Sequence, residues 1–97
     1  MDRYRYINSN DFMMQVSNGI IKDIILKNIQ NATKKPFELT ITPKDLSGDP
    51  FMTSVFFDLH DRDMTFRTEI EVIYVDKNNE ISYIINKIKE QHPQLFI

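Results

Sequence analysis

The stretch MTFRTEIEVIYV, residues Met64–Val75, decides the fold because its side chains alternate in character from one residue to the next. The even positions are mostly apolar, whereas the odd positions begin with Thr65, Arg67, Glu69 and Glu71. Successive side chains of a strand point to opposite faces of a sheet, so the pattern predicts one apolar and one charged face. The stretch contains no Gly or Pro. We predict a long strand over all of these residues, spanning the whole sheet.

Two shorter segments, 37–42 and 53–59, also alternate between apolar and polar side chains, and each is predicted to be a strand. The polar segment His60–Asp63 is short enough to be a hairpin loop between the second and third strands. In that hairpin we expect Leu59 to lie opposite Met64. The next pairs on the same face are then Phe57 opposite Phe66 and Val55 opposite Thr68.

Helical periodicity flanks the strands on both sides. In residues 12–35, apolar side chains recur every three or four positions through Val16, Ile20 and Ile24, which predicts one helix with a kink near the middle. Residues 80–92 show the same spacing more cleanly and predict a second amphipathic helix. A proline follows each segment, as is typical of helix ends.

These elements predict a small α+β domain in the order α-β-β-β-α, occupying residues 1–97 as a single domain. We expect a three-stranded antiparallel meander with both helices packed on its apolar face, and a short N-terminal edge strand over residues 3–7 as an option. The predicted shared core consists of Val16, Ile20, Ile24, Leu39, Val55, Phe57, Phe66, Ile70, Val72, Ile81, Ile84 and Ile88.

Composition narrows the class of protein. The chain has no Cys, so disulfides, thiolate metal sites and cysteine nucleophiles are excluded. No apolar run is long enough to cross a membrane and no signal-peptide core is present at the N-terminus, so we expect a cytoplasmic protein without membrane contact. The skew toward Ile, Asn and Lys is typical of AT-rich genes and points to a bacterial or mobile-element origin.

Charge argues against direct nucleic-acid binding. Residues 37–76, which contain the strands, carry three basic and nine acidic side chains, a net charge of 3 − 9 = −6. Such a sheet repels a phosphate backbone. Double-stranded RNA-binding domains share the α-β-β-β-α order, but they open the last helix with a lysine-rich run. Here those positions read Asn78-Asn79-Glu80-Ile81-Ser82.

Two further hypotheses, a metal site and a hydrolase site, concern the side chains of the predicted hairpin. Asp58, His60, Asp61 and Asp63 crowd the predicted hairpin, but their spacing does not continue as a calcium loop, so we favour solvated carboxylates and no metal or other cofactor. The third functional hypothesis is a small metal- or His-dependent hydrolase that uses His60 and the surrounding carboxylates, or His60 and His92 as an acid–base pair. Because the chain has no nucleophile motif and no phosphate loop, we expect no enzyme.

The charged face of the sheet is the predicted functional surface. It combines carboxylates with apolar side chains, and exposed apolar clusters ringed by charge mark interaction sites. The predicted partner-binding residues are Glu38, Phe56, Asp58, Glu69, Glu71, Ile73 and Val75. We expect a non-catalytic protein-interaction module whose acidic face binds a basic partner, for example a phage or mobile-element inhibitor of a nucleic-acid-binding host protein. One alternative is a structural subunit of a homo-oligomer, such as a phage assembly component, in which the apolar end of the third strand at Ile73 and Val75 forms the contact. Another is an outer face covered by the N-terminal arm or the Leu95–Ile97 tail.

Overall fold

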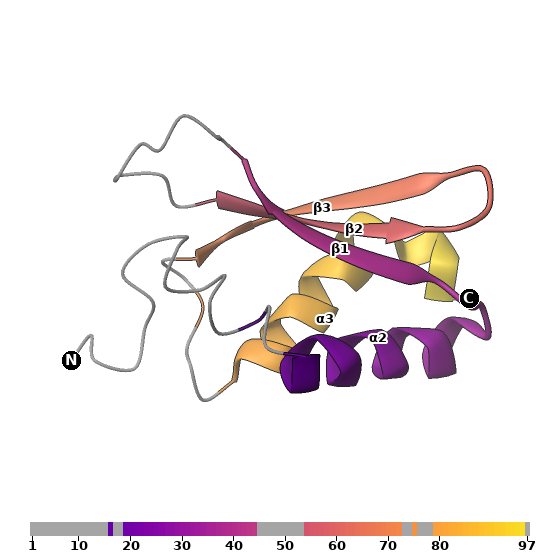
Figure 1. Cartoon of the computed structure of the whole chain (residues 1–97), viewed down its shortest axis with the longest axis horizontal. Coiled ribbons are helices and arrows are strands. Elements are labelled where there is room, and N and C mark those ends of the chain that lie inside the picture. Colours follow the sequence, from indigo (N-terminus) through magenta and orange to yellow (C-terminus); the bar gives the residue numbers. More distant parts are fainter. Residues whose placement is uncertain (1–15, 17–18, 45–53, 73–74, 76–78, 97) are drawn as a thin grey trace.

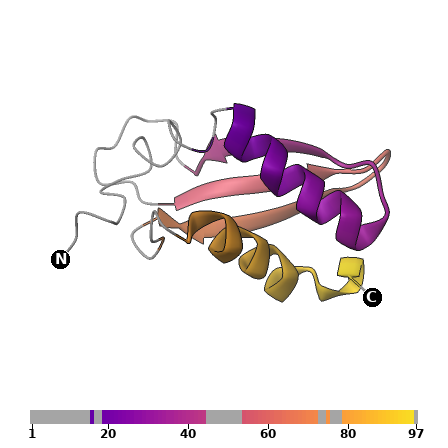
Figure 2. The ribbon, with the colours of Figure 1, turned by 90° about the horizontal axis from the view of Figure 1, so that it is seen from below.

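The computed structural model describes residues 16, 19–44, 54–72, 75 and 79–96. Its elements are helix α2 (Gly19–Thr33), strands β1 (Glu38–Pro43), β2 (Ser54–His60) and β3 (Thr65–Glu71), helix α3 (Glu80–Gln91) and the 3-10 helix η3 (Pro93–Phe96). The predicted order α-β-β-β-α and the antiparallel meander β1-β2-β3 are confirmed. Both helices lie in one layer against one face of the sheet (Figures 1 and 2). The optional strand over residues 3–7 falls outside the described residues.

The β2–β3 hairpin turns one residue later in the chain than predicted, because β2 extends to His60 and β3 begins at Thr65. The Asp61 amide donates to the Met64 carbonyl at 2.9 Å, so the loop contains only Arg62 and Asp63 between these two residues. Leu59 therefore lies opposite Phe66 rather than opposite Met64, and the whole register shifts by two residues. Because side chains alternate with a period of two, this shift leaves every side chain on its predicted face.

The third strand is shorter than predicted. β3 ends at Glu71, which pairs with Ser54, the first residue of β2. A strand continues only while a neighbour supplies ladder hydrogen bonds, and this ladder ends at Ser54. Val72 is in a 3-10 conformation and its carbonyl accepts a hydrogen bond from the Val75 amide at 3.1 Å, so the chain turns there.

Helix α2 buries a different stripe from the one predicted. Ile25 and Ile29 are fully buried, whereas Ile20 is 69% and Ile24 is 38% exposed. The sequence contains two overlapping isoleucine stripes, and the one that packs includes Ile21 in place of Ile20. The core assignments of Ile20 and Ile24 were wrong, because they carried the phase of Val16 through a single continuous helix.

The end of α2 is set by backbone geometry. Lys34 adopts a left-handed conformation, with φ of 62°, and its amide donates to the Gln30 carbonyl at 2.7 Å. A residue in this conformation is a common helix terminator. The chain then reverses so that β1 runs back above α2 (Figure 1).

The core lies between the sheet and the two helices, and most of the predicted members occupy it. The buried apolar side chains are Val16, Ile25, Ile29, Phe37, Leu39, Val55, Phe57, Leu59, Ile70, Val72, Val75, Ile84, Ile88 and Leu95. Phe66 and Ile81 are half-buried and pack at its margin. Each fully buried aliphatic or aromatic side chain of this kind contributes about 1.5–3 kcal/mol through removal from water.

Side chains from the end of α3 close the β3 edge of the sheet. The His92 Nε2–H donates to the carbonyl of Arg67 at 2.8 Å, and Gln91 Nε2 donates to the carbonyl of Glu69 at 3.3 Å. The His92 ring also packs edge-on against Phe66, with 5.6 Å between ring centroids. These contacts satisfy outward-pointing carbonyls that an edge strand otherwise leaves to solvent or to another chain.

Candidate functional site

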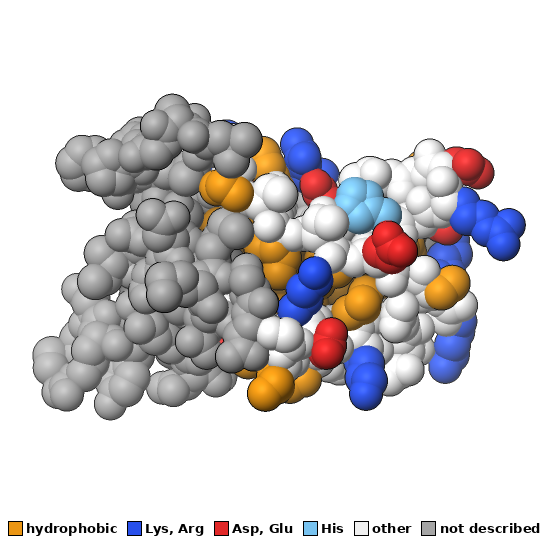
Figure 3. Space-filling model, in the orientation of Figure 1, with side chains coloured by type: hydrophobic (Ala, Val, Ile, Leu, Met, Phe, Trp, Pro, Cys, Tyr) orange, Lys and Arg blue, Asp and Glu red, His pale blue; other side chains and the backbone are white. Residues whose placement is uncertain are grey.

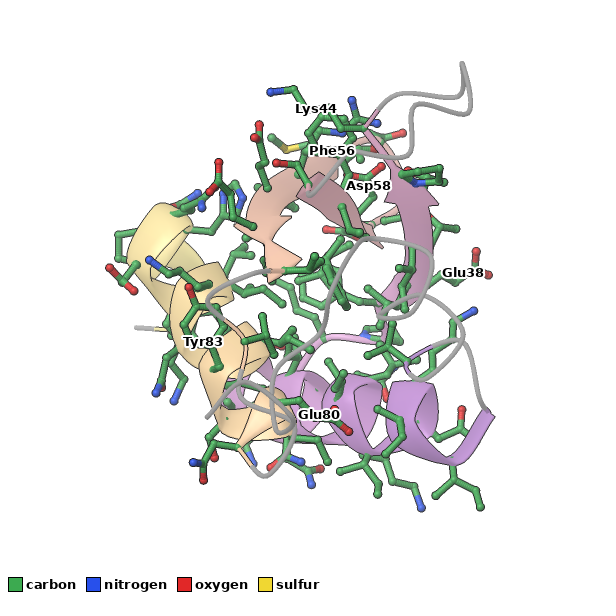
Figure 4. All side chains as sticks on the ribbon, turned by 90° about the vertical axis from the view of Figure 1, so that its left-hand side faces the viewer. Glu38, Lys44, Phe56, Asp58, Glu80 and Tyr83 are labelled. Carbon is green, nitrogen blue, oxygen red and sulfur yellow. The ribbon has the colours of Figure 1, made fainter. Side chains whose placement is uncertain are left out.

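The face of the sheet opposite the helices, called the outer face below, carries the side chains that alternate with the core residues. Its described members are Glu38, Thr40, Thr42 and Lys44 from β1 and its end, Ser54, Phe56, Asp58 and His60 from β2, and Thr65, Arg67, Glu69 and Glu71 from β3. Figure 4 shows Lys44, Phe56 and Asp58 on the side of the sheet away from both helices.

An ion pair stacked on an aromatic ring forms the centre of the outer face. Arg67 lies opposite Asp58 in the ladder and donates two hydrogen bonds to its carboxylate, at 2.9 Å from Nε and 3.0 Å from Nη2. The guanidinium carbon also lies 4.1 Å from the centroid of the Phe56 ring. The Asp58 side chain is 7% exposed and the Arg67 side chain is 56% exposed. The carboxylate is therefore covered, while the cation is presented to solvent.

The electrostatics of this pair favour the charged guanidinium. The pKa of Arg67 is raised, chiefly by the hydrogen bond to Asp58; desolvation opposes this, and the charge of the carboxylate raises the pKa further. Arginine is already fully protonated at neutral pH. The stacked guanidinium is therefore a charged group at neutral pH.

A histidine links all three strands on the outer face. His60 lies between Thr40 and Thr65, with Nε2 at 2.8 Å from the Thr40 hydroxyl and Nδ1 at 3.1 Å from the Thr65 hydroxyl. A neutral imidazole has one donor and one acceptor nitrogen, and a hydroxyl can take either role, so either tautomer is accommodated. The His60 ring is therefore held in position by neutral partners.

The outer face is acidic overall, although less so than its carboxylates alone suggest. It carries four acidic side chains against two basic ones, a net of 2 − 4 = −2 with histidine neutral. Lys44 Nζ lies 3.1 Å from Glu69 Oε2, and the two side chains are 53% and 39% exposed. Glu38 and Glu71 are exposed. The negative charge is therefore concentrated toward the margin, around the Asp58–Arg67 centre.

Five of the seven predicted partner-binding residues lie on the outer face: Glu38, Phe56, Asp58, Glu69 and Glu71. Val75 does not, since it is fully buried in the core, and its prediction as a surface residue was wrong. The prediction extended the alternation of β3 past Glu71, where the chain turns. Ile73 lies outside the described residues.

Sequence reasoning missed the roles of Arg67, Lys44 and His60 at this face. The signal for the Asp58–Arg67 pair was present as opposite charges on neighbouring strands. It could be read only with the correct register, because the predicted hairpin placed Asp58 opposite Thr65. The Lys44–Glu69 pair spans two ladders and depends on both registers.

The hairpin carboxylates that were candidates for a metal site make other contacts, and Asp58 is buried rather than solvated as predicted. Asp61 Oδ1 accepts a hydrogen bond from the Arg62 amide at 2.7 Å, and Lys35 Nζ lies 4.0 Å from its other oxygen. Across the described ranges, no group of three or more His, Asp or Glu side chains is placed to hold a metal ion. His60 is on the outer face and His92 caps the β3 edge, so they belong to different surfaces.

The described residues of the C-terminal tail, Leu95 and Phe96, do not lie over the outer face. Leu95 of η3 is 8% exposed and belongs to the core, and Phe96 packs beside it. The Lys89 ammonium lies 5.5 Å from the Phe96 ring centroid, which places this ring next to α3. The described part of the tail therefore packs on the helical side. The N-terminal arm is outside the described residues.

Comparison of the chain with protein-family models, with curated proteins and with solved structures gives no match. Within the described residues, neither α2 nor α3 has the length and apolar content needed to span a bilayer.

Proposed function

We propose that this domain is a non-catalytic protein-interaction module that binds a partner protein with a basic surface through its outer face. The Asp58–Arg67–Phe56 centre is the observation that carries the proposal. Arginine and aromatic side chains dominate the energetics of protein interfaces, usually near the middle of the contact. Here both types lie in contact, with Phe56 on the middle strand β2 and Arg67 on the neighbouring strand β3. They lie on the side of the sheet that neither helix covers (Figure 4).

The surrounding charge supports a basic partner. Glu38, Glu69 and Glu71 lie around the centre and give the outer face its negative balance. Complementary charge raises the association rate and makes it sensitive to salt, while the desolvated centre supplies most of the binding energy. A nucleic-acid-binding cleft of another protein offers such a basic surface. An inhibitor of such a protein, encoded by a phage or mobile element, is consistent with this chemistry and with the composition of the chain.

The alternative, a structural subunit of a homo-oligomer that uses the apolar end of the third strand, loses one of its contact residues. Val75 was expected to contribute to that contact, and it is buried in the core. Self-association through that surface is therefore not proposed.

The test compares the wild type with a variant that reverses two charges of the outer face, and with Phe56→Ala. The immobilised chain is exposed to lysate of an AT-rich bacterium, retained proteins are identified by mass spectrometry, and binding kinetics are measured with the purified candidate. Glu69→Lys combined with Glu71→Lys should abolish retention of the candidate and reduce its association rate at low salt at least tenfold. Phe56→Ala should leave association nearly unchanged and accelerate dissociation, as expected for loss of a central contact.

The matched control carries the same charge change away from the outer face. Asp63→Lys combined with Glu90→Lys alters two exposed carboxylates in the hairpin loop and on α3. This control should retain the partner with wild-type kinetics. Retention by the outer-face variant with the wild-type rate and salt dependence would show that the outer face is not the binding surface.

A further inference from the structure

The hydrogen-bond pattern of the β1–β2 ladder determines which peptide groups of β1 point outward. The Lys44 amide donates to the Ser54 carbonyl at 3.1 Å, so this opposed pair is a hydrogen-bonded one. Hydrogen-bonded and non-hydrogen-bonded pairs alternate residue by residue along an antiparallel ladder, with the bonded type recurring every second residue. Thr42 and Thr40, two and four residues from Lys44, therefore direct their amides and carbonyls toward β2.

The residues between them direct their peptide groups to the open edge. Leu39 and Ile41 present both an N–H and a C=O there, while their side chains point toward the core. Among the described residues, no hydrogen bond from another element reaches these groups. The open stretch is bounded on both sides, because Gln30 Nε2 donates to the Phe37 carbonyl at 3.0 Å and Pro43 has no N–H. Unlike the β3 edge, the β1 edge thus offers a short and defined segment for pairing.

This segment is complementary to itself. When two β1 strands run antiparallel about a two-fold axis at Thr40, Leu39 of each copy lies opposite Ile41 of the other. Both pairs are then hydrogen-bonded pairs, and every outward N–H and C=O of Leu39 and Ile41 finds a partner. On the outer face, Thr40 meets Thr40 of the second copy and Glu38 meets Thr42. No like charges are opposed, and paired threonines are favourable across strands.

The surface below the β1 edge also suits a second copy. A groove of about 420 Å³ lies between β1 and α2. It is lined by residues 37–40, which form the start of β1 and the residue before it, and by Lys22, Asp23 and Leu26 of α2. Lys22 and Asp23 are adjacent and opposite in charge, so together they add no net charge to the groove. Figure 3 shows hydrophobic, basic and acidic side chains mixed over the described part of this side.

We propose that a second copy of this chain binds along the β1 edge, with Thr40 of each copy on the two-fold axis, to form a continuous six-stranded sheet. An exposed strand edge is a template for pairing with another chain, and pairing with an identical strand about a two-fold axis gives a closed dimer. This interface uses the edge of the sheet rather than the outer face, and it does not depend on the proposed function.

Single cysteines test the register directly, because the chain has no cysteine of its own. In a non-hydrogen-bonded antiparallel pair the Cα atoms are about 4.5 Å apart, which falls within the range for a disulfide. Thr40→Cys should therefore form a covalent dimer under mild oxidation. In the same register, Thr42→Cys lies about 13 Å from its counterpart, since the two are four residues apart along the strands. It should cross-link at least tenfold more slowly.

The mass of the unmodified chain gives the second measurement. Light scattering after size-exclusion chromatography should show the mass of a dimer. The measurement is repeated over a range of protein concentrations. Thr40→Lys opposes two cations at the axis and should return the chain to a monomer. Thr42→Lys places a cation opposite Glu38 of the second copy and should keep the dimer. Both positions are exposed, so folding should be unaffected in either variant.

The outcomes distinguish a second copy of this chain from a strand of another protein as the partner of the β1 edge. A chain that stays monomeric at all concentrations, with equal cross-linking of the two cysteine variants, overturns the proposal and leaves the edge to a strand from another protein. A dimer in which Thr40→Cys cross-links no faster than Thr42→Cys also overturns it, because that dimer is formed through another surface or register. A dimer with selective cross-linking at Thr40→Cys supports the proposed pairing.

Discussion

Asp58 of β2 and Arg67 of β3 face each other across the hairpin and share two hydrogen bonds, yet only the arginine reaches solvent. The two partners therefore differ in what their loss leaves behind. Without Arg67, a carboxylate remains covered and without its counterion. Without Asp58, a guanidinium remains at the surface and is hydrated. Leaving a buried charge unpartnered is the more costly of the two.

We predict that Arg67→Met destabilises the fold more than Asp58→Asn does. Urea denaturation of the two variants, followed by circular dichroism, gives the comparison. Lys44→Met is the matched control, since it removes a cation from a pair whose members are both substantially exposed. It should change the free energy of unfolding by no more than about 1 kcal/mol. An equal effect of Arg67→Met and Lys44→Met would contradict the burial of Asp58.

Neighbouring isoleucines of α2 provide a test of the helix orientation. Ile25→Ala should lower the free energy of unfolding by about 2–5 kcal/mol, because it opens a cavity in the core. Ile24→Ala should lower it by less than about 1 kcal/mol, because Ile24 is 38% exposed and alanine favours the helix. Denaturant melts of both variants decide between the two isoleucine stripes. A larger effect at Ile24 than at Ile25 would restore the stripe predicted from the sequence.

Thr68 offers a stabilising substitution. It is fully buried on the core face of β3, opposite Phe57, and its hydroxyl finds no hydrogen-bond partner in the described part of the chain. An unsatisfied buried hydroxyl costs about 1–3 kcal/mol. Thr68→Val removes the hydroxyl with little change in shape, so we predict a rise of about 1–2 kcal/mol in the free energy of unfolding.

The control for Thr68 is Thr42→Val on the outer face, which is exposed and should alter stability by less than about 0.5 kcal/mol. Differential scanning calorimetry of both variants at the same pH measures the difference. Destabilisation by Thr68→Val would indicate that the hydroxyl is hydrogen-bonded in solution.

The hairpin carboxylates are predicted to be solvated and to need no metal. Calcium, magnesium, manganese and zinc should each leave the melting temperature of the wild type nearly unchanged. Asp61→Asn combined with Asp63→Asn should likewise fold normally, since Asp63 is exposed and the Asp61–Lys35 contact is long, at 4.0 Å. A rise of several degrees with one of these ions, absent from the double variant, would instead identify a metal site.

Alternation of side chains was sufficient to predict the faces of the sheet. Leu39, Val55, Phe57 and Ile70 were assigned to the core, and they are buried there. The hairpin register was wrong by two residues, an error that alternation cannot detect because it preserves both faces. The length of β3 was also wrong, since a strand ends where its partner ends, and this is a property of the pair rather than of either sequence.

The helix stripe shows a second limit. Isoleucines at 20, 21, 24, 25 and 29 offer two overlapping apolar faces, and local periodicity does not choose between them. The choice depends on which face meets the sheet. For the outer face, alternation of side chains was enough to predict which carboxylates lie there. Predicting the Asp58–Arg67 pair also required the correct register between β2 and β3. Val75 was misassigned because the alternation was carried into the turn after Glu71.

A two-fold axis at Thr40 stands perpendicular to the sheet, so the outer faces of both copies look in the same direction. The Arg67–Phe56 centre of each copy would then be presented in parallel on one broad surface. A partner that repeats its basic site, such as an oligomer or a protein polymerised along a nucleic acid, could engage both centres at once. The second contact would be intramolecular and governed by effective concentration. Such a domain would discriminate assembled targets from free subunits by avidity alone.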